Sequence, residues 1–273
     1  MEQVTLNNGV QMPVMGFGTF QTPPALTEES VERALKIGYR SIDTAQVYEN
    51  EAGVGAAVKN SGIVRQNLFI TTKTQTDGYD ETIKGIDESL KKLQMGYIDL
   101  MIIHWPMGNS LETYRAMADA YKAGKIRAIG LSNFNPAQID AILKYSDVKP
   151  VIDQIETHLY WQQSKIAPYL AEHEIVHEAW APFGEEYAKE MIQLPEITEL
   201  AKKYNVSGAQ ILLRAMTQQK IVVIPKSNNE AHLKSNLDIF NFKLTDAELE
   251  GLKKFDKHRS IKDWPVSMRE TNY

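Results

Sequence analysis

Along most of the chain, short runs of apolar residues alternate with longer segments whose apolar residues recur every three or four positions. The short runs are typical of buried strands, and the longer period is typical of helices that pack on a sheet. Eight such pairs follow one another. We expect their strands and helices at 14–17 and 28–37, 41–43 and 52–59, 69–72 and 79–93, 100–103 and 111–123, 126–131 and 136–143, 151–155 and 165–171, 176–179 and 208–218, and 221–224 and 230–240.

This alternation predicts parallel strands closed into a barrel. Eight pairs without a Pro-, Gly- or Ser-rich linker are typical of the (β/α)8 TIM barrel, an α/β fold that commonly takes about 250 residues as one domain. We therefore expect a single barrel domain over residues 1–273 and no separate cofactor domain. A doubly wound open sheet also alternates, but Gly16-Phe17-Gly18-Thr19-Phe20 lacks the third glycine and the helix start of its phosphate loop.

Additional elements flank this repeat. Asn8-Gly9 supplies a hairpin turn before the first expected strand of the barrel. Further helices are expected at 194–204 and 245–255. Capping boxes, in which a Ser or Thr precedes a Gln or Glu by three residues, predict helix starts at Ser207 with Gln210, Ser227 with Glu230, and Thr245 with Glu248.

The composition excludes several classes of function. The chain has 43% hydrophobic and 24% charged residues and a net charge of −5, which gives no reason to expect nucleic acid or an anionic membrane as a partner. It has no cysteine, so disulfide frameworks and thiolate metal sites are excluded. The start, Met1-Glu2-Gln3-Val4-Thr5-Leu6, has no signal-peptide pattern, and no apolar run approaches the roughly 20 residues of a membrane span. We expect a cytoplasmic protein.

Four reactive side chains stand at or just beyond the ends of expected strands: Asp43, Tyr48, Lys73 and His104. In a barrel these ends form the mouth, where active sites lie, so the four should meet. A tyrosine of pKa about 10 exchanges its proton poorly at neutral pH, but a nearby ammonium favours the phenolate, and an aspartate can fix that ammonium. His104 could hydrogen-bond a carbonyl oxygen and orient it toward Tyr48. The set suits reduction of a C=O group, with hydride added to carbon and a proton passed from Tyr48 to oxygen.

Two short motifs suggest other chemistries. His173-Glu174-Ile175-Val176-His177 matches the H-E-x-x-H pattern of zinc hydrolases, which needs both histidines on one helix face. The alternation instead predicts a strand there, but a zinc-dependent hydrolase that uses His173, Glu174 and His177 stays an alternative. Ser132 with Tyr145 and Lys149 has the spacing of short-chain dehydrogenases, without the glycine loop that their cofactor needs.

Taken together, the motifs resemble those of the aldo-keto reductase family, especially its bacterial 2,5-diketogluconate reductase-like members of the monomeric TIM-barrel type. The resemblance implies that Asp43, Tyr48, Lys73 and His104 form a catalytic tetrad in which Tyr48 is the general acid. The matching stretches run in collinear order and are Gly16-Phe17-Gly18-Thr19, Asp43-Thr44-Ala45 with Tyr48-Glu49-Asn50-Glu51, Thr71-Thr72-Lys73, Ile103-His104-Trp105-Pro106, Gly130-Leu131-Ser132-Asn133-Phe134, Gln154-Ile155-Glu156, Ala181-Pro182 and Val223-Ile224-Pro225-Lys226-Ser227.

The same resemblance implies a nicotinamide dinucleotide across the barrel mouth, NADPH first and NADH as a further candidate. Ser132, Asn133 and Gln154 would bind its carboxamide, and Trp180 would stack on the nicotinamide ring. Lys226 and Ser227, at a helix start, would hold the 2′-phosphate. The other implied cofactor contacts are Gly18, Thr19, Asp43, Pro182, His232 and Asn236, and the implied substrate pocket comprises Phe20, Tyr48, Gln75, His104, Trp105 and Trp264.

Three departures from the family pattern carry expectations of their own. His232 stands where the family usually has an arginine, and a mostly neutral histidine predicts a preference for NADPH over NADH below roughly a thousandfold. Gln75 replaces a tryptophan, which predicts a more polar pocket wall. Phe183-Gly184-Glu185-Glu186 brings two acids to the loop that covers the pyrophosphate, so we expect that loop to be differently placed.

These observations predict a monomeric NAD(P)H-dependent reductase of small aldehydes and ketones, including sugar-derived ketones, with no metal. Beside the zinc hydrolase, a non-catalytic nucleotide-binding sensor on the same fold is an alternative, against which the complete tetrad argues.

Overall fold

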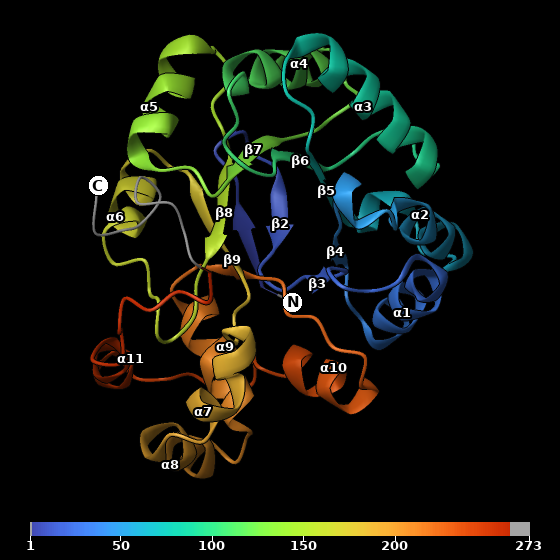
Figure 1. Ribbon diagram of the computed structural model, residues 1–273. Coiled ribbons are helices and arrows are strands. Elements are labelled where there is room, and N and C mark those ends of the chain that lie inside the picture. Colours follow the sequence, from blue (N-terminus) through green and yellow to red (C-terminus); the bar gives the residue numbers. More distant parts are fainter. Residues whose placement is uncertain (1, 263–273) are drawn as a thin grey trace.

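The expected barrel is present. The computed structural model describes residues 2–262, and its centre is a sheet of eight parallel strands surrounded by helices (Figure 1). Met15 forms a parallel bridge with Val223, and the Gly16 N–H donates to the Val223 carbonyl at 2.9 Å, so the first and last strands meet and the barrel closes. The strands pair in chain order and are β3 (Phe17–Gly18), β4 (Ser41–Asp43), β5 (Phe69–Thr74), β6 (Leu100–Ile103), β7 (Ile129–Ser132), β8 (Ile152–Glu156), β9 (Val176–Trp180) and β10 (Val222–Val223).

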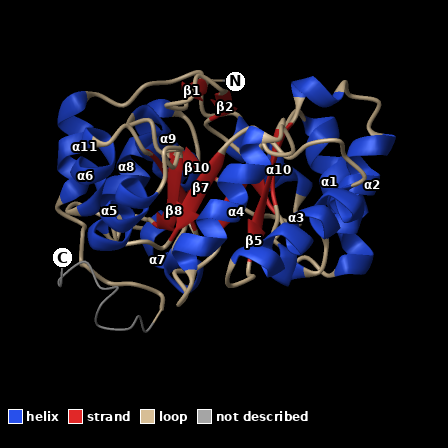
Figure 2. Cartoon of the chain, turned by 90° about the horizontal axis from the view of Figure 1, so that it is seen from above, coloured by secondary structure: helices blue, strands red, loops and turns tan. Residues whose placement is uncertain are grey.

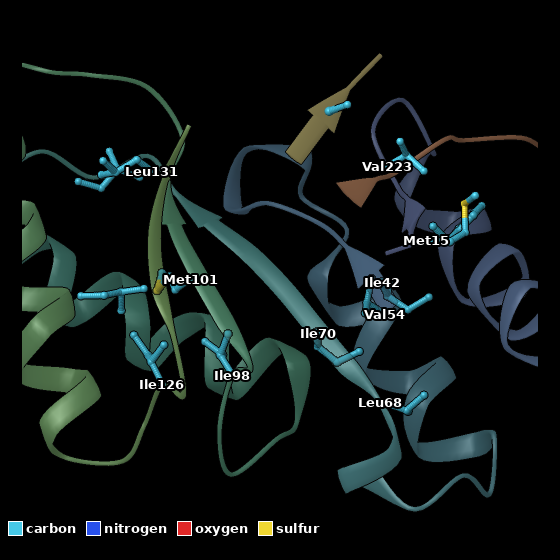
Figure 3. Packing of buried hydrophobic residues seen from close by; sticks show 14 of the residues in the cluster. Met15, Ile42, Val54, Leu68, Ile70, Ile98, Met101, Ile126, Leu131 and Val223 are labelled. Atoms are coloured by element: carbon cyan, nitrogen blue, oxygen red, sulfur yellow. The ribbon is translucent and has the colours of Figure 1, made fainter. Parts of the chain in front are cut away.

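The helices lie outside the sheet and cover its outer face. Ile42, Ile70 and Met101 point outward from their strands into one buried apolar cluster, which also contains Val54 of the second helix (Figure 3). One helix follows each of the strands β3 to β8, three follow β9, and two follow β10 within the described residues. They are α1 (Pro24–Ile37), α2 (Glu51–Asn60), α3 (Tyr79–Leu93), α4 (Ser110–Lys122), α5 (Pro136–Tyr145), α6 (Ile166–Glu172), α7 (Ala188–Ile192), α8 (Pro195–Tyr204), α9 (Gly208–Gln218), α10 (Glu230–Leu237) and α11 (Asp246–Lys253).

A hairpin of β1 (Gln3–Thr5) and β2 (Gln11–Pro13) seals one end of the barrel. Its Leu6 and Met12 pack in a second apolar cluster with inward-facing strand residues such as Leu100. The Asn7 amide donates to the Pro150 carbonyl at 2.9 Å, which ties the hairpin to the start of β8. Figure 2 shows the hairpin at one end and α7 at the other. The hairpin therefore covers the end where the strands begin and leaves the opposite end, where they finish, uncovered by it.

The predicted Asn8-Gly9 turn is confirmed, because Gly9 has a φ of 86° and the Leu6 and Val10 backbones pair across it. The capping boxes of Ser207 and Thr245 are also confirmed. The capping box of Ser227 with Glu230 is wrong. The N-cap of α10 is Asn229, whose side chain accepts from the His232 N–H at 3.1 Å.

The zinc-hydrolase motif does not form a metal site. Helix α6 ends at Glu172, His173 caps it, and β9 begins at Val176, so the two histidines do not share a helix face. The His177 ring is buried and its Nε2 lies 2.7 Å from the Thr157 hydroxyl. No group of three or more metal-ligating side chains occurs between residues 2 and 262. The zinc alternative is therefore wrong.

None of the helices described is both long and apolar enough to cross a membrane.

Candidate active site

A cavity of about 440 Å³ opens at the carboxyl ends of the strands. Polar groups from several strand ends meet apolar and aromatic walls there, the arrangement typical of a small-molecule site. The residues predicted from the sequence that line it are Gly18, Phe20, Asp43, Tyr48, His104, Trp105, Ser132, Asn133, Gln154, Trp180, Pro182 and Lys226.

Lys73 and Asp43 form a buried ion pair at the base of this cavity. Lys73 lies near the end of β5, only 1% exposed, and its ammonium pairs with the Asp43 carboxylate and donates to the Thr44 carbonyl at 3.1 Å. Asp43 ends β4, the strand beside it. Burial lowers the pKa of Lys73, but the charge of Asp43, its hydrogen bond to the ammonium and the further acidic groups nearby together outweigh that effect, so the pKa is raised. Lys73 is therefore a fixed cation.

Tyr48 stands above this ion pair, at the end of the short 3₁₀ helix η1 (Gln46–Tyr48). The Lys73 Nζ lies 5.1 Å from the centre of its ring. Burial raises the pKa of Tyr48, and the positive charge of Lys73 offsets only part of that rise. The ammonium favours the phenolate as expected, but burial decides the net direction of the shift. Before reaction, Tyr48 holds its proton and can donate it.

His104 completes the group at the end of β6. Its ring centre is 5.6 Å from that of Tyr48 at 78°, and it stacks on Trp105 at 5.7 Å. Burial, assisted by the charge of Lys73, lowers the pKa of His104 to about 3. The imidazole is therefore neutral at physiological pH, and a neutral imidazole still offers one N–H to a bound oxygen.

Ser132, Asn133 and Trp180 form a hydrogen-bonded row along the next wall. The Asn133 amide donates to the Ser132 hydroxyl at 2.9 Å and to the His104 carbonyl at 3.1 Å. The Trp180 indole N–H donates to Asn133 Oδ1 at 2.9 Å, which fixes the plane of the indole. Asn133 adopts a φ of 64°, a left-handed conformation that asparagine tolerates better than most residues.

Gln154, on β8, connects this row to the ion pair. Its amide nitrogen donates to Asp43 Oδ2 at 3.0 Å and to Glu178 Oε2 at 2.8 Å. Glu178 was not singled out from the sequence. Its signal was the two-residue period of a strand, because Trp180 faces the cavity and Glu178 precedes it by two residues. Burial and the charge of Asp43 raise the pKa of Glu178 to about 8.

Of the side chains expected at the phosphate end of the cofactor, only Lys226 lines the cavity. Lys226 lines the cavity, but Ser227 does not, and its hydroxyl accepts from the Asn229 N–H at 3.1 Å. His232 is exposed on α10, and Asn236 is buried in the same helix. Neither His232 nor Asn236 contributes to the cavity wall.

Two further predicted positions, Thr19 and Gln75, do not line the cavity. Thr19 is fully buried, and its N–H and hydroxyl both donate to the Asp43 carbonyl, at 2.9 and 3.0 Å. It supports the strand end and does not line the cavity. Gln75 is exposed and also outside the lining, so the more polar wall expected from it stays a prediction. Trp264 lies outside the described residues. The aromatic walls in place are Trp105 and Phe20, the latter 5.2 Å from the Tyr48 ring.

The loop after β9 turns an acid toward the cavity. Glu185 begins the 3₁₀ helix η3 (Glu185–Tyr187) and lines the cavity together with Lys262. The Lys262 Nζ lies 3.9 Å from Glu185 Oε2. This cation offsets the repulsion that the acid alone would exert on a bound phosphate.

The side chains present fit a nicotinamide dinucleotide. Gln154 lines the cavity with its amide nitrogen already engaged, so its Oε1 remains to accept a hydrogen bond. Trp180 offers an indole held in one plane, and Lys226 offers a cation farther along the same cavity. An amide acceptor, an aromatic face and a cation are the groups that a carboxamide, a planar ring and a phosphate require.

Comparison with known proteins gives a consistent result. A sequence profile of the aldo/keto reductase family matches residues 14–257. The chain is 39% identical to glyoxal reductase of Bacillus subtilis, with 95% of each sequence covered, and 37% identical to methylglyoxal reductase DkgA of Escherichia coli, with 94% of each covered. It is also similar to the crystal structure of a Bombyx mori aldo-keto reductase in complex with NADP, with a TM-score of 0.89, 34% identity and coverage of 97% of this chain and 95% of that one.

Proposed function

The chain belongs to the aldo/keto reductase family, and from this premise we propose that it reduces small aldehydes and ketones to alcohols with NADPH, with Tyr48 as the proton donor. It is an oxidoreductase acting on carbonyl groups. The observation that supports the assignment of the site is that Asp43, Tyr48 and His104 line one cavity and that Lys73 is paired with Asp43 beside the Tyr48 ring.

The four side chains suit the proton half of the reaction. A carbonyl oxygen beside Tyr48 and His104 would accept hydrogen bonds from the phenol and from the neutral imidazole, which orients it and polarises the C=O bond. A nicotinamide held by Gln154, Ser132, Asn133 and Trp180 would supply the hydride to the carbon. As negative charge develops on the oxygen, Tyr48 transfers its proton, and the ammonium of Lys73 stabilises the phenolate that remains. Asp43 keeps that ammonium in place.

We also propose which residues contact the nicotinamide dinucleotide. Gln154 would accept from the carboxamide, Ser132 and Asn133 would complete its hydrogen bonds, Trp180 would stack on the ring, and Lys226 would face a phosphate. This arrangement needs no separate cofactor domain. One chain supplies the whole cavity wall described, which favours activity as a monomer.

We infer that short 2-oxoaldehydes are among the substrates. The similar proteins from Bacillus subtilis and Escherichia coli are named for glyoxal and methylglyoxal. The region around Tyr48 is walled by Phe20 and Trp105, which favours a compact substrate over a large polar one.

The test is to follow NADPH consumption against glyoxal, methylglyoxal, simple aldehydes and ketoses, and to identify the alcohol formed. Consumption of one NADPH for each alcohol is expected, fastest with the 2-oxoaldehydes. Binding of NADPH without turnover of any carbonyl in the panel would favour the non-catalytic sensor instead.

A further inference from the structure

Glu178 is a buried acid with no task in the reaction as proposed. It lies on β9 with 0% of its surface exposed. Its Oε2 accepts from the Gln154 amide at 2.8 Å, and its Oε1 has no hydrogen-bond partner in the described part of the chain. Burying an incompletely paired carboxyl group disfavours folding, so its place in the barrel interior points to a role in the site.

The surroundings of Gln154 reveal that role. Its amide nitrogen carries two hydrogens, and Asp43 and Glu178 lie at 3.0 and 2.8 Å to accept them. Reversing the amide would set its oxygen against the ionised Asp43 carboxylate. Asp43 therefore fixes the orientation and Glu178 accepts the second hydrogen, so the amide oxygen of Gln154 stays free of both and is available to the cavity that the residue lines.

We propose that Glu178 is a positioning residue, which together with Asp43 holds the Gln154 amide so that its oxygen accepts a hydrogen bond from the carboxamide NH₂ of the nicotinamide. This rests on the proposed use of NADPH. Glu178 touches neither the carbonyl substrate nor the reacting atoms in this arrangement. It acts through Gln154, and a correctly held carboxamide fixes how the nicotinamide ring is presented to Tyr48.

The charge of Glu178 is compatible with this role. The groups that face it are Asp43 from β4, Lys73 from β5 and Gln154 from β8. Since its pKa is raised to about 8, Glu178 is mostly protonated at pH 7 and still accepts through its carbonyl oxygen. It therefore adds little negative charge beside the Lys73 ammonium.

The test compares two ligands on the full-length protein by calorimetry at pH 7: NADPH, and 2′,5′-ADP, which lacks the nicotinamide. Glu178→Leu should weaken NADPH binding about fivefold, the equivalent of one hydrogen bond of ~1 kcal/mol, and leave 2′,5′-ADP binding unchanged. Glu178→Gln keeps an acceptor and should restore NADPH affinity. Glu178→Met serves as a second apolar variant, and thermal unfolding establishes that each variant is folded.

A double-mutant cycle then asks whether Glu178 acts through Gln154. In a Gln154→Leu background, Glu178→Leu should weaken NADPH binding no further. Additive losses, or a parallel loss of 2′,5′-ADP affinity, would overturn the positioning role and leave the proposed function intact. Failure of the unaltered protein to bind NADPH would instead contradict the proposed function itself.

Discussion

Around Lys73, burial and charge together set the protonation states of Lys73, Tyr48 and His104. Burial alone would lower the pKa of the Lys73 ammonium, but the neighbouring Asp43 carboxylate keeps it charged. Burial, with a smaller contribution from the same cation, keeps His104 neutral, and the cation lowers the pKa of Tyr48 by less than burial raises it. Each residue thus begins the reaction in the protonation state that its proposed role requires, with the phenol as a donor and the imidazole uncharged.

This balance predicts the effect of Lys73→Met. The substitution leaves the Asp43 carboxylate buried without its partner, so the free energy of unfolding should fall by about 3 kcal/mol, and turnover should collapse because the phenolate loses its neighbouring charge. Urea unfolding and kcat measure the two effects. The double variant Asp43→Asn, Lys73→Met should recover part of the stability and none of the turnover. Full turnover in the single variant would remove Lys73 from the proton transfer.

The sequence predicted the residues at strand ends better than those within strands. Asp43, Tyr48, Lys73 and His104 were found because the end of a short apolar run is visible in the sequence. Glu178 was missed because it lies inside β9, between His177 and Ala179, and only the inward direction of Trp180 could have placed it. The net direction of the Tyr48 pKa shift could not be predicted from the sequence either, because it depends on how deeply the folded chain buries the phenol.

Among the elements, helices with strong internal signals were predicted with their correct ends. Helix α3 has the predicted bounds, Tyr79–Leu93, and carries Asp80 and Glu81 in its first turn and Lys91 and Lys92 in its last, as the helix dipole favours. Helix α10 was less predictable, since Ser227 and Asn229 compete for its N-cap. Asparagine and serine are similarly good N-caps, so only the path of the loop decides between them.

Helix α10 also carries a prediction about the cofactor. His232 is exposed in its first turn, and a positive charge there would lie where the family resemblance places the 2′-phosphate. His232→Arg should therefore tighten NADPH binding about tenfold, or ~1.4 kcal/mol, and leave NADH binding unchanged.

The matched control for this substitution is His232→Gln, which adds no charge and should leave both affinities near those of the unaltered protein. Comparing kcat/KM for the two cofactors in the unaltered protein tests the related expectation, a preference for NADPH below roughly a thousandfold. A larger preference, or equal gains for NADPH and NADH in His232→Arg, would show that His232 does not face the phosphate.

On the scale of the whole molecule, the apolar cluster beneath the hairpin and the candidate active site lie at opposite ends of the barrel. The hairpin lies at the end where the strands begin (Figure 2), and its apolar cluster seals that end. The cavity opens where the strands finish. The repeat of strands and helices was enough to predict this architecture. The exact path of the loop after β9 was not predictable, because the contact of Glu185 with Lys262 joins parts of the chain that are far apart in sequence.

This separation predicts that Leu6→Ala destabilises the protein without changing its catalysis. Leu6 is buried in the cluster beneath the hairpin, so its truncation should cost about 2–5 kcal/mol of unfolding free energy. Below the unfolding transition, kcat and KM should match those of the unaltered protein. A changed KM with an unchanged unfolding midpoint would mean that the hairpin influences substrate binding at the opposite end of the barrel.

The proton-donating role of Tyr48 is the central claim, and Tyr48→Phe tests it most directly. The variant keeps the ring and its packing and lacks only the hydroxyl. We expect NADPH to bind with nearly unchanged affinity, while the single-turnover rate of NADPH oxidation by methylglyoxal falls at least about a hundredfold, the usual range for loss of a general acid. A rate within a few-fold of the unaltered protein, with NADPH bound, would contradict the account.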